Sequence, residues 1–240
     1  MVKHRCSPLG DSAVRVAFGN QISKEINRDI RSFCELLKAE QPTGVIEWTP
    51  SYTAVTIYYL PKLATYDEIV AQVSELLAKI DQVTISKSRR VFVPVCYGGE
   101  YGPDIAQVAD HNDLLMEDVI KIHTAENYLV YMLGFTPGFP YLGGMSKAIC
   151  TPRQAVPRMN VPAGSVGIAD EQTGIYSLST PGGWQIIGRT PLVLYDGHRD
   201  KPALFEAGDY IKFCSIKQSE YQKIEFLVER NMYELQYDFF

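Results

Sequence analysis

The stretch of sequence that decides the fold reads GFTPGFPYLGG and covers residues 134–144. It opens a region, from Gly134 to Pro191, that is dense in glycine and proline compared with the rest of the chain. Helices of normal length do not run through such spacing, because proline removes a backbone donor and glycine weakens the helix. Short strands joined by tight turns do, and closure into a barrel leaves no exposed edge. We therefore expect a mainly-β barrel here.

The elements on either side of this region extend the barrel domain. The polar stretch Lys87–Arg90 marks a boundary, so we expect an N-terminal domain over residues 1–88 and a barrel domain over residues 89–240. Within the second domain we expect strands over 91–95, 127–133, 192–195, 203–205 and 210–215, and helices over 104–109, 114–124 and 221–230.

The first 88 residues predict a compact α+β unit. Residues 12–18 alternate as a half-buried strand does, and Ser23 is a good N-cap for a helix to about Ala39. Further strands are expected over 45–48, 54–60 and 83–85, and a second amphipathic helix over 66–80. The order strand, helix, strand, strand, helix, strand is that of a ferredoxin-like domain.

Composition excludes several classes of function. The net charge of −5 and the pI of about 5.4 argue against a general binder of nucleic acid or anionic membranes. The five cysteines are scattered without a CxxC pair, which suits reduced thiols and a cytoplasmic location, and neither they nor the four histidines have the spacing of metal ligands. We also expect no signal peptide and no membrane span.

Two familiar catalytic patterns fail when their context is checked. The glycines of residues 138–146 do not form a phosphate loop, because Gly144 stands where that motif needs lysine. Residues 163–167 read AGSVG, but Pro162 precedes them and no helix is expected afterwards, so Ser165 lacks the context of a nucleophile elbow.

The loops between Gly134 and Pro191 leave two interpretations open. Arg153, Arg158 and Arg189 follow turn residues, and the remaining loop side chains are rich in aromatics, glutamine and threonine. Either these are barrel turns with solvated arginines, or they line a rigid cleft suited to a carboxylate or phosphate. His123, at the end of an expected helix, is either stabilised by the helix dipole or acts as an acid or base in that cleft.

The loop motifs resemble those of the family of 5-oxoprolinase B subunits, also called allophanate hydrolase subunit 1, which includes the sporulation kinase A inhibitor. The resemblance rests on residues 134–143, Pro152-Arg153, Pro157-Arg158, residues 161–168, residues 172–176 and residues 181–191. It extends more weakly to residues 9–13 and 95–99, and so covers the whole chain.

The resemblance implies a cyclophilin-like form of the barrel and work within an assembly. The A and C subunits of a 5-oxoprolinase would act with this chain to open 5-oxo-L-proline to L-glutamate with ATP, with Mg²⁺ accompanying the nucleotide and none bound tightly by this chain. The alternative that it implies is a regulatory protein that binds and inhibits a sensor histidine kinase. Prolyl isomerase activity does not follow, because a fold does not fix a function.

Site roles follow from this combination of chemistry and resemblance. We expect Arg153 and Arg158 to hold the substrate carboxylate or a phosphoryl group, and His123 and Gln172 to orient water. The residues expected to contact the substrate are Phe139, Tyr141, Tyr176, Trp184 and Arg189. No metal ligands are expected in this chain.

Overall fold

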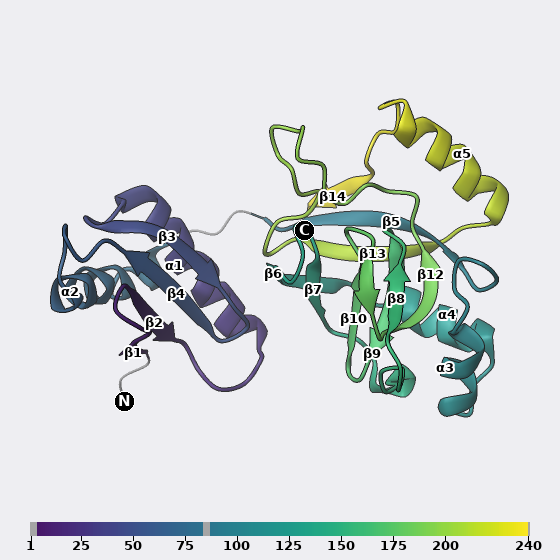
Figure 1. The fold of residues 1–240 in the computed structure, drawn as a ribbon, viewed down its shortest axis with the longest axis horizontal. Coiled ribbons are helices and arrows are strands. Elements are labelled where there is room, and N and C mark those ends of the chain that lie inside the picture. Colours follow the sequence, from purple (N-terminus) through teal and green to yellow (C-terminus); the bar gives the residue numbers. More distant parts are fainter. Residues whose placement is uncertain (1–3, 84–86, 240) are drawn as a thin grey trace. The chain divides into compact units, whose positions relative to one another are not determined.

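The structure is a computed structural model that describes residues 4–83 and 87–239. Its contacts divide the chain into two compact units, residues 1–86 and 87–240, and each is described by itself (Figure 1). The predicted boundary after Ser88 stays a prediction, because only a fragment can test independent folding. Within the described residues, no helix has the length and apolar character needed to cross a membrane.

The first unit is a four-stranded antiparallel sheet with helices. Its strands lie in the order β1-β2-β4-β3. Its elements are β1 (Arg5–Pro8), β2 (Ala13–Ala17), α1 (Lys24–Glu40), β3 (Val45–Pro50), β4 (Ala54–Tyr59), α2 (Tyr66–Leu77) and the 3₁₀ helix η1 (Ile80–Gln82).

Local sequence explains where both helices begin. The Ser23 side chain accepts a hydrogen bond from the Ile26 backbone N–H at 3.1 Å and so caps α1 as predicted. Thr65 and Glu68 form a reciprocal capping box at the start of α2. The apolar stripes of both helices join the strands in one core, which includes Phe33, Ile57 and Val73.

The predicted α+β character is confirmed, with one difference at the edge of the sheet. The position beside β2 is filled by β1, a short strand that the alternation pattern did not reveal. The strand expected over 83–85 lies largely outside the described residues, and Val83 itself is not in a strand.

The second unit is a nearly closed mixed β-barrel. Its main sheet runs β10-β9-β12-β5-β13-β6-β7, and β10 lies against β7 at the other end. Only the β5–β13 pair in this described sheet is parallel. The strands are β5 (Arg89–Tyr97), β6 (Tyr128–Leu133), β7 (Pro140–Gly143), β9 (Ser165–Ala169), β10 (Gln172–Ile175), β12 (Gln185–Arg189) and β13 (Tyr210–Ser215).

Helices and a separate two-stranded sheet pack around this barrel. They are α3 (Ile105–His111), α4 (Met116–Ala125), the 3₁₀ helix η2 (Lys147–Ile149), α5 (Gln218–Glu229) and the ribbon of β8 (Arg158–Val161) with β11 (Thr180–Gly182). The strand β14 (Tyr237–Phe239) pairs with the beginning of β5. Alternate residues of β5, Val91, Val93 and Val95, point into the barrel core.

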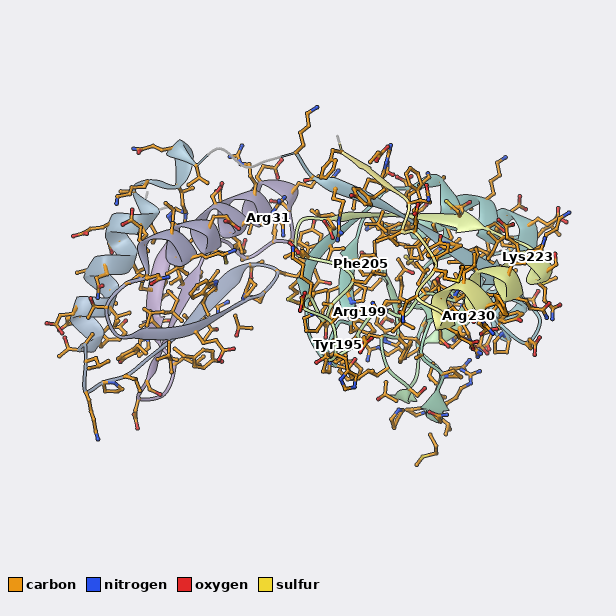
Figure 2. All side chains as sticks on the ribbon, turned by 90° about the horizontal axis from the view of Figure 1, so that it is seen from above. Arg31, Tyr195, Arg199, Phe205, Lys223 and Arg230 are labelled. Atoms are coloured by element: carbon orange, nitrogen blue, oxygen red, sulfur yellow. The ribbon has the colours of Figure 1, made fainter. Side chains whose placement is uncertain are left out.

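Two predicted strands are wrong. Residues 192–195 and 203–205 are not ladder strands; they share only one isolated bridge, between Tyr195 and Ala203. Pro191 and Pro202 lack the N–H that a longer ladder needs, and residues 196–202 make a tight turn. Tyr195, Arg199 and Phe205 of this segment lie along one side of the barrel unit (Figure 2).

Candidate functional site

A cleft with a volume of about 170 Å³ lies on the outer face of the barrel. Thr173 and Ile175 of β10 point inward, so Gln172 and Gly174 of the same strand point outward. The cleft is lined by Phe135, Phe139, Tyr141, Arg153, Gln172, Tyr176, Gly182, Gly183 and Trp184. The glycine- and proline-rich loops therefore surround a cleft.

Phe139 is the centre of the aromatic lining. Its ring makes edge-to-face contacts with Phe135, Tyr141, Tyr176 and Trp184, at centroid distances from 5.3 to 5.9 Å. Gly174 lies beneath them, and a Cβ there would come within 3.0 Å of both Phe139 and Trp184. A side chain at this position would push the two rings outward, so glycine lets them pack this closely.

The loop before Phe139 is held by its own backbone. The N–H of Gly134 donates to the carbonyl of Phe139 at 3.1 Å, and the N–H of Phe139 donates to Thr136 at 3.1 Å. Phe135 takes a left-handed conformation with φ 62°, and its side chain is largely exposed at the mouth of the cleft. A bulky residue with positive φ is uncommon, and such residues cluster at binding sites.

Arg153 is the cation that lines the cleft. Its side chain is 59% exposed, and its guanidinium lies 3.7 Å from Asp170, a loose ion pair that leaves it available to a ligand. Gln154 and Gln185 fix the backbone beside it: the Gln154 side chain donates to that of Gln185 at 2.6 Å, and Gln185 donates to the Pro152 carbonyl at 2.8 Å. The Gln154 N–H also donates to Gly183 at 2.7 Å, which ties this segment to the cleft wall.

Tyr176 brings a hydroxyl into the aromatic lining. Its side chain is buried, and burial raises its pKa above the ordinary value. A hydrogen bond from the Trp184 backbone and the nearby charges of Arg153 and Arg158 act in the opposite direction and lower the pKa.

Arg158 forms an ion pair with a buried carboxylate of the barrel unit. Its guanidinium donates to the Asp104 carboxylate at 2.6 Å, and the other oxygen of Asp104 accepts from the Ile186 N–H at 2.6 Å. Asp104 is almost fully buried. The predicted role of Arg158 in holding substrate has no support from this position, because its charge is already neutralised behind the Trp184 wall.

Arg189 lies away from the cleft. Its guanidinium is 5.9 Å from the ring centre of Tyr101. Burial raises the pKa of Tyr221 on α5 to about 12, and the charge of Arg189 opposes that rise. The three arginines predicted to share one cleft are therefore separated, since only Arg153 is among the described residues that line it.

His123 lies in the barrel core and does not line the cleft. Thr173 donates its hydroxyl proton to the Gly167 carbonyl at 3.0 Å, so its oxygen accepts from His123 Nε2 at 2.9 Å. The other ring nitrogen, Nδ1, then accepts from the Tyr97 hydroxyl at 2.8 Å. Burial lowers the pKa of His123 to about 3, so the ring is neutral. This geometry explains His123 as a satisfied core residue and gives no support to its predicted role in orienting water.

The sequence interpretation found most of the cleft but missed some of its parts. Of the predicted residues, the structure brings together Phe139, Tyr141, Arg153, Gln172, Tyr176 and Trp184. Phe135, Gly182 and Gly183 were not singled out, although all three stand within the same loops. Asp104 had no sequence signal, because its partner Arg158 is 54 residues away along the chain. The Ser165 side chain is buried, which agrees with its rejection as a nucleophile.

The fold and loops place the chain in a known class. Residues 4–205 match the family described as carboxyltransferase domain, subdomain C and D. Two curated relatives are both B subunits of 5-oxoprolinase. That of Bacillus subtilis is 44% identical over 230 residues, covering 92% of this chain and 96% of the relative. That of Haemophilus influenzae is 39% identical over 206 residues, covering 86% and 95%.

A solved structure agrees with this relationship. A conserved uncharacterized protein from Pyrococcus horikoshii is 43% identical, with a TM-score of 0.54, and the match covers 90% of this chain and all of that one. The chain belongs to the family of 5-oxoprolinase B subunits.

Proposed function

We propose that this chain is the B subunit of an ATP-dependent 5-oxoprolinase, and that the cleft centred on Phe139 holds the ring of 5-oxo-L-proline. The observation that carries the proposal is an aromatic cleft of about 170 Å³ with one accessible guanidinium among its described lining residues. Aromatic faces suit a small planar lactam, and the fork of Arg153 suits its carboxylate. The kinship with B subunits of 5-oxoprolinases supports the same substrate.

The chemistry assigns this chain a binding and positioning role. A lactam is a poor electrophile, and transfer of a phosphoryl group from ATP to its oxygen would make the ring carbon more reactive toward water. Arg153 would hold the substrate carboxylate, Gln172 would orient the polar edge of the ring, and the aromatic walls would exclude bulk water.

The A and C subunits would supply the remaining groups. Among the described residues, the cleft lining contains no carboxylate, serine, cysteine or histidine. Phosphoryl transfer needs Mg²⁺ ligands and contacts to the nucleotide, so the proposal places these on the partners. His123, Arg158 and Arg189 have no direct substrate contact in it. The alternative role as an inhibitor of a sensor histidine kinase stays a prediction that rests on the sequence resemblance alone.

The proposal is tested by reconstitution. The chain is purified alone and co-purified with its A and C partners, and glutamate release from 5-oxoproline is measured with and without ATP. We expect turnover only by the complete assembly and only with ATP. Turnover by the chain alone, or an intact assembly that releases no glutamate, would contradict the proposal.

A further inference from the structure

The Tyr176 hydroxyl lies at the cleft, and no acceptor for its proton is found among the described residues. The side chain belongs to the apolar cluster of Phe139, Val161 and Trp184, yet it also lines the cleft. Across residues 4–83 and 87–239, the structure gives this hydroxyl no acceptor for its proton. By contrast, the core hydroxyls of Tyr97, Tyr128 and Thr173 each have a protein partner at 2.8 to 3.0 Å.

The surroundings of the hydroxyl favour donation toward the cleft. Burial raises the pKa of this hydroxyl, while the Trp184 backbone and the charges of Arg153 and Arg158 act in the opposite direction. An oxygen with a backbone dipole and positive charges acting on it is a poor acceptor for a further donor. Its own O–H is polarised in the same direction, so the complementary ligand group is an electron-rich oxygen.

Glycine at position 182 leaves space beside this hydroxyl. A Cβ built on Gly182 would lie 2.2 Å from the Tyr176 hydroxyl oxygen and 2.8 Å from the adjacent ring carbons. Gly182 also lines the cleft, at the end of β11 opposite Arg158. The gap left by the absent side chain is therefore part of the cleft and lies next to the hydroxyl.

We propose that the Tyr176 hydroxyl donates a hydrogen bond to the lactam oxygen of the bound ring, with Arg153 holding the carboxylate. The inference rests on the proposed function, and it assigns Tyr176 the recognition of the lactam group in addition to a wall of the cleft. A carbonyl oxygen has two lone pairs, so one is bound and oriented by Tyr176 while the other stays free to accept the phosphoryl group. No bond to Tyr176 is made or broken.

The test uses Tyr176→Phe and Gly182→Ala in the assembly with its partner subunits. The measured quantities are kcat and KM for 5-oxo-L-proline, and inhibition constants for two ring analogues. The first, 2-pyrrolidinone, keeps the lactam and lacks the carboxylate; the second, cyclopentanecarboxylate, keeps the carboxylate and lacks the lactam. Tyr58→Phe and Gly197→Ala are the matched controls, since Tyr58 is partly exposed on β4 and a Cβ at Gly197 meets nothing closer than 3.9 Å.

The expected result is a change in selectivity. Each cleft variant should lower the affinity for 5-oxoproline and for 2-pyrrolidinone about three- to ten-fold, as expected for the loss of one neutral hydrogen bond. The affinity for cyclopentanecarboxylate should stay within about two-fold of wild type. Arg153→Ala should show the converse pattern: it should lower the affinity for 5-oxoproline and cyclopentanecarboxylate, the two ligands that carry a carboxylate. If Tyr176 served only in packing, the substitutions would lower the affinity for all three ligands together.

The outcomes separate the inference from the function on which it rests. If the wild-type assembly does not cleave 5-oxoproline, the proposed function fails. If the wild type cleaves it and both cleft variants keep wild-type selectivity, or lose all three ligands equally, the hydroxyl does not recognise the lactam. Gly182→Ala retains the hydroxyl, so the inference stays testable even where Tyr176→Phe folds poorly.

Discussion

The two faces of strand β10 border two different sets of polar groups. Those on the inner face have protein partners, and those on the outer face line a cleft. On the inner face of β10, Thr173 joins His123 and Tyr97 in a network in which each group has a partner. On the outer face, Gln172 lines a cleft with Arg153 and Tyr176, where a guanidinium is accessible and a hydroxyl proton has no acceptor in the described structure. Neighbouring residues of similar type therefore serve stability on one side and binding on the other, because one side is closed and the other is open.

The largest expected loss of stability comes from a substitution that breaks the inner hydrogen-bond network. His123→Ala leaves the Tyr97 hydroxyl without its acceptor and opens a cavity, so we expect a loss of about 3 kcal/mol or more in the free energy of unfolding. Gln172→Ala, on the adjacent outward position, should cost less than about 1 kcal/mol and mainly weaken substrate binding. Urea denaturation of both variants measures the difference; equal losses would show that the two faces are not distinct.

The next largest effect is a difference in stability between substitutions of two arginines that the sequence does not distinguish. Arg158→Ala strips the buried Asp104 of its partner, and we expect a loss of about 2 to 3 kcal/mol in stability. Arg153→Ala should change stability by less than about 0.5 kcal/mol, yet lower turnover of the assembly about ten-fold. Thermal melts beside steady-state kinetics give both numbers. Equal melting of the two variants would contradict the structural assignment of Arg158.

The pH dependence of stability sharpens the comparison further. The pKa of His123 is about 3 in the folded state and about 6.5 unfolded, so protons bind preferentially to the unfolded chain. The stabilising effect of the neutral ring is complete above pH 6.5 and is lost progressively as the pH falls toward 3. From pH 7.5 to 5.5 we expect this residue alone to lower stability by about 1.4 kcal/mol.

The control for this effect is His123→Asn, which has no proton to gain in that range. The stability of the wild type should fall more steeply over pH 7.5 to 5.5 than that of the variant, as measured by denaturant titrations at each pH. Parallel curves would mean that His123 is accessible to protons in the folded state.

The smallest expected effect concerns the separation of the two units. A fragment of residues 89–240 begins at the first residue of β5 and contains both faces of β10 with all the described cleft residues. We expect it to fold alone and to melt within about 3 °C of the corresponding transition in the full chain. Amide dispersion in an NMR spectrum is the check, and a collapsed, unfolded-type spectrum would move the boundary or remove it.

The sequence by itself determined the fold class and named most of the residues that line the cleft. Glycine and proline at the spacing of residues 134–191 exclude long helices, and alternation and helix caps are local signals, so they are visible without a structure. The motifs of the same loops contain Phe139, Tyr141, Arg153, Gln172, Tyr176 and Trp184, and the turns that present them are local as well.

Only the tertiary structure decided what each charged or polar residue does. Arg153, Arg158 and Arg189 look alike in sequence, because each follows a proline or glycine, but their roles depend on groups far along the chain. Asp104 neutralises Arg158, while Tyr101 lies against Arg189. Likewise, the end of a helix does not reveal whether His123 faces solvent or core. Pairing, burial and the direction of a side chain are set when distant segments pack together, and that information is not local to any motif.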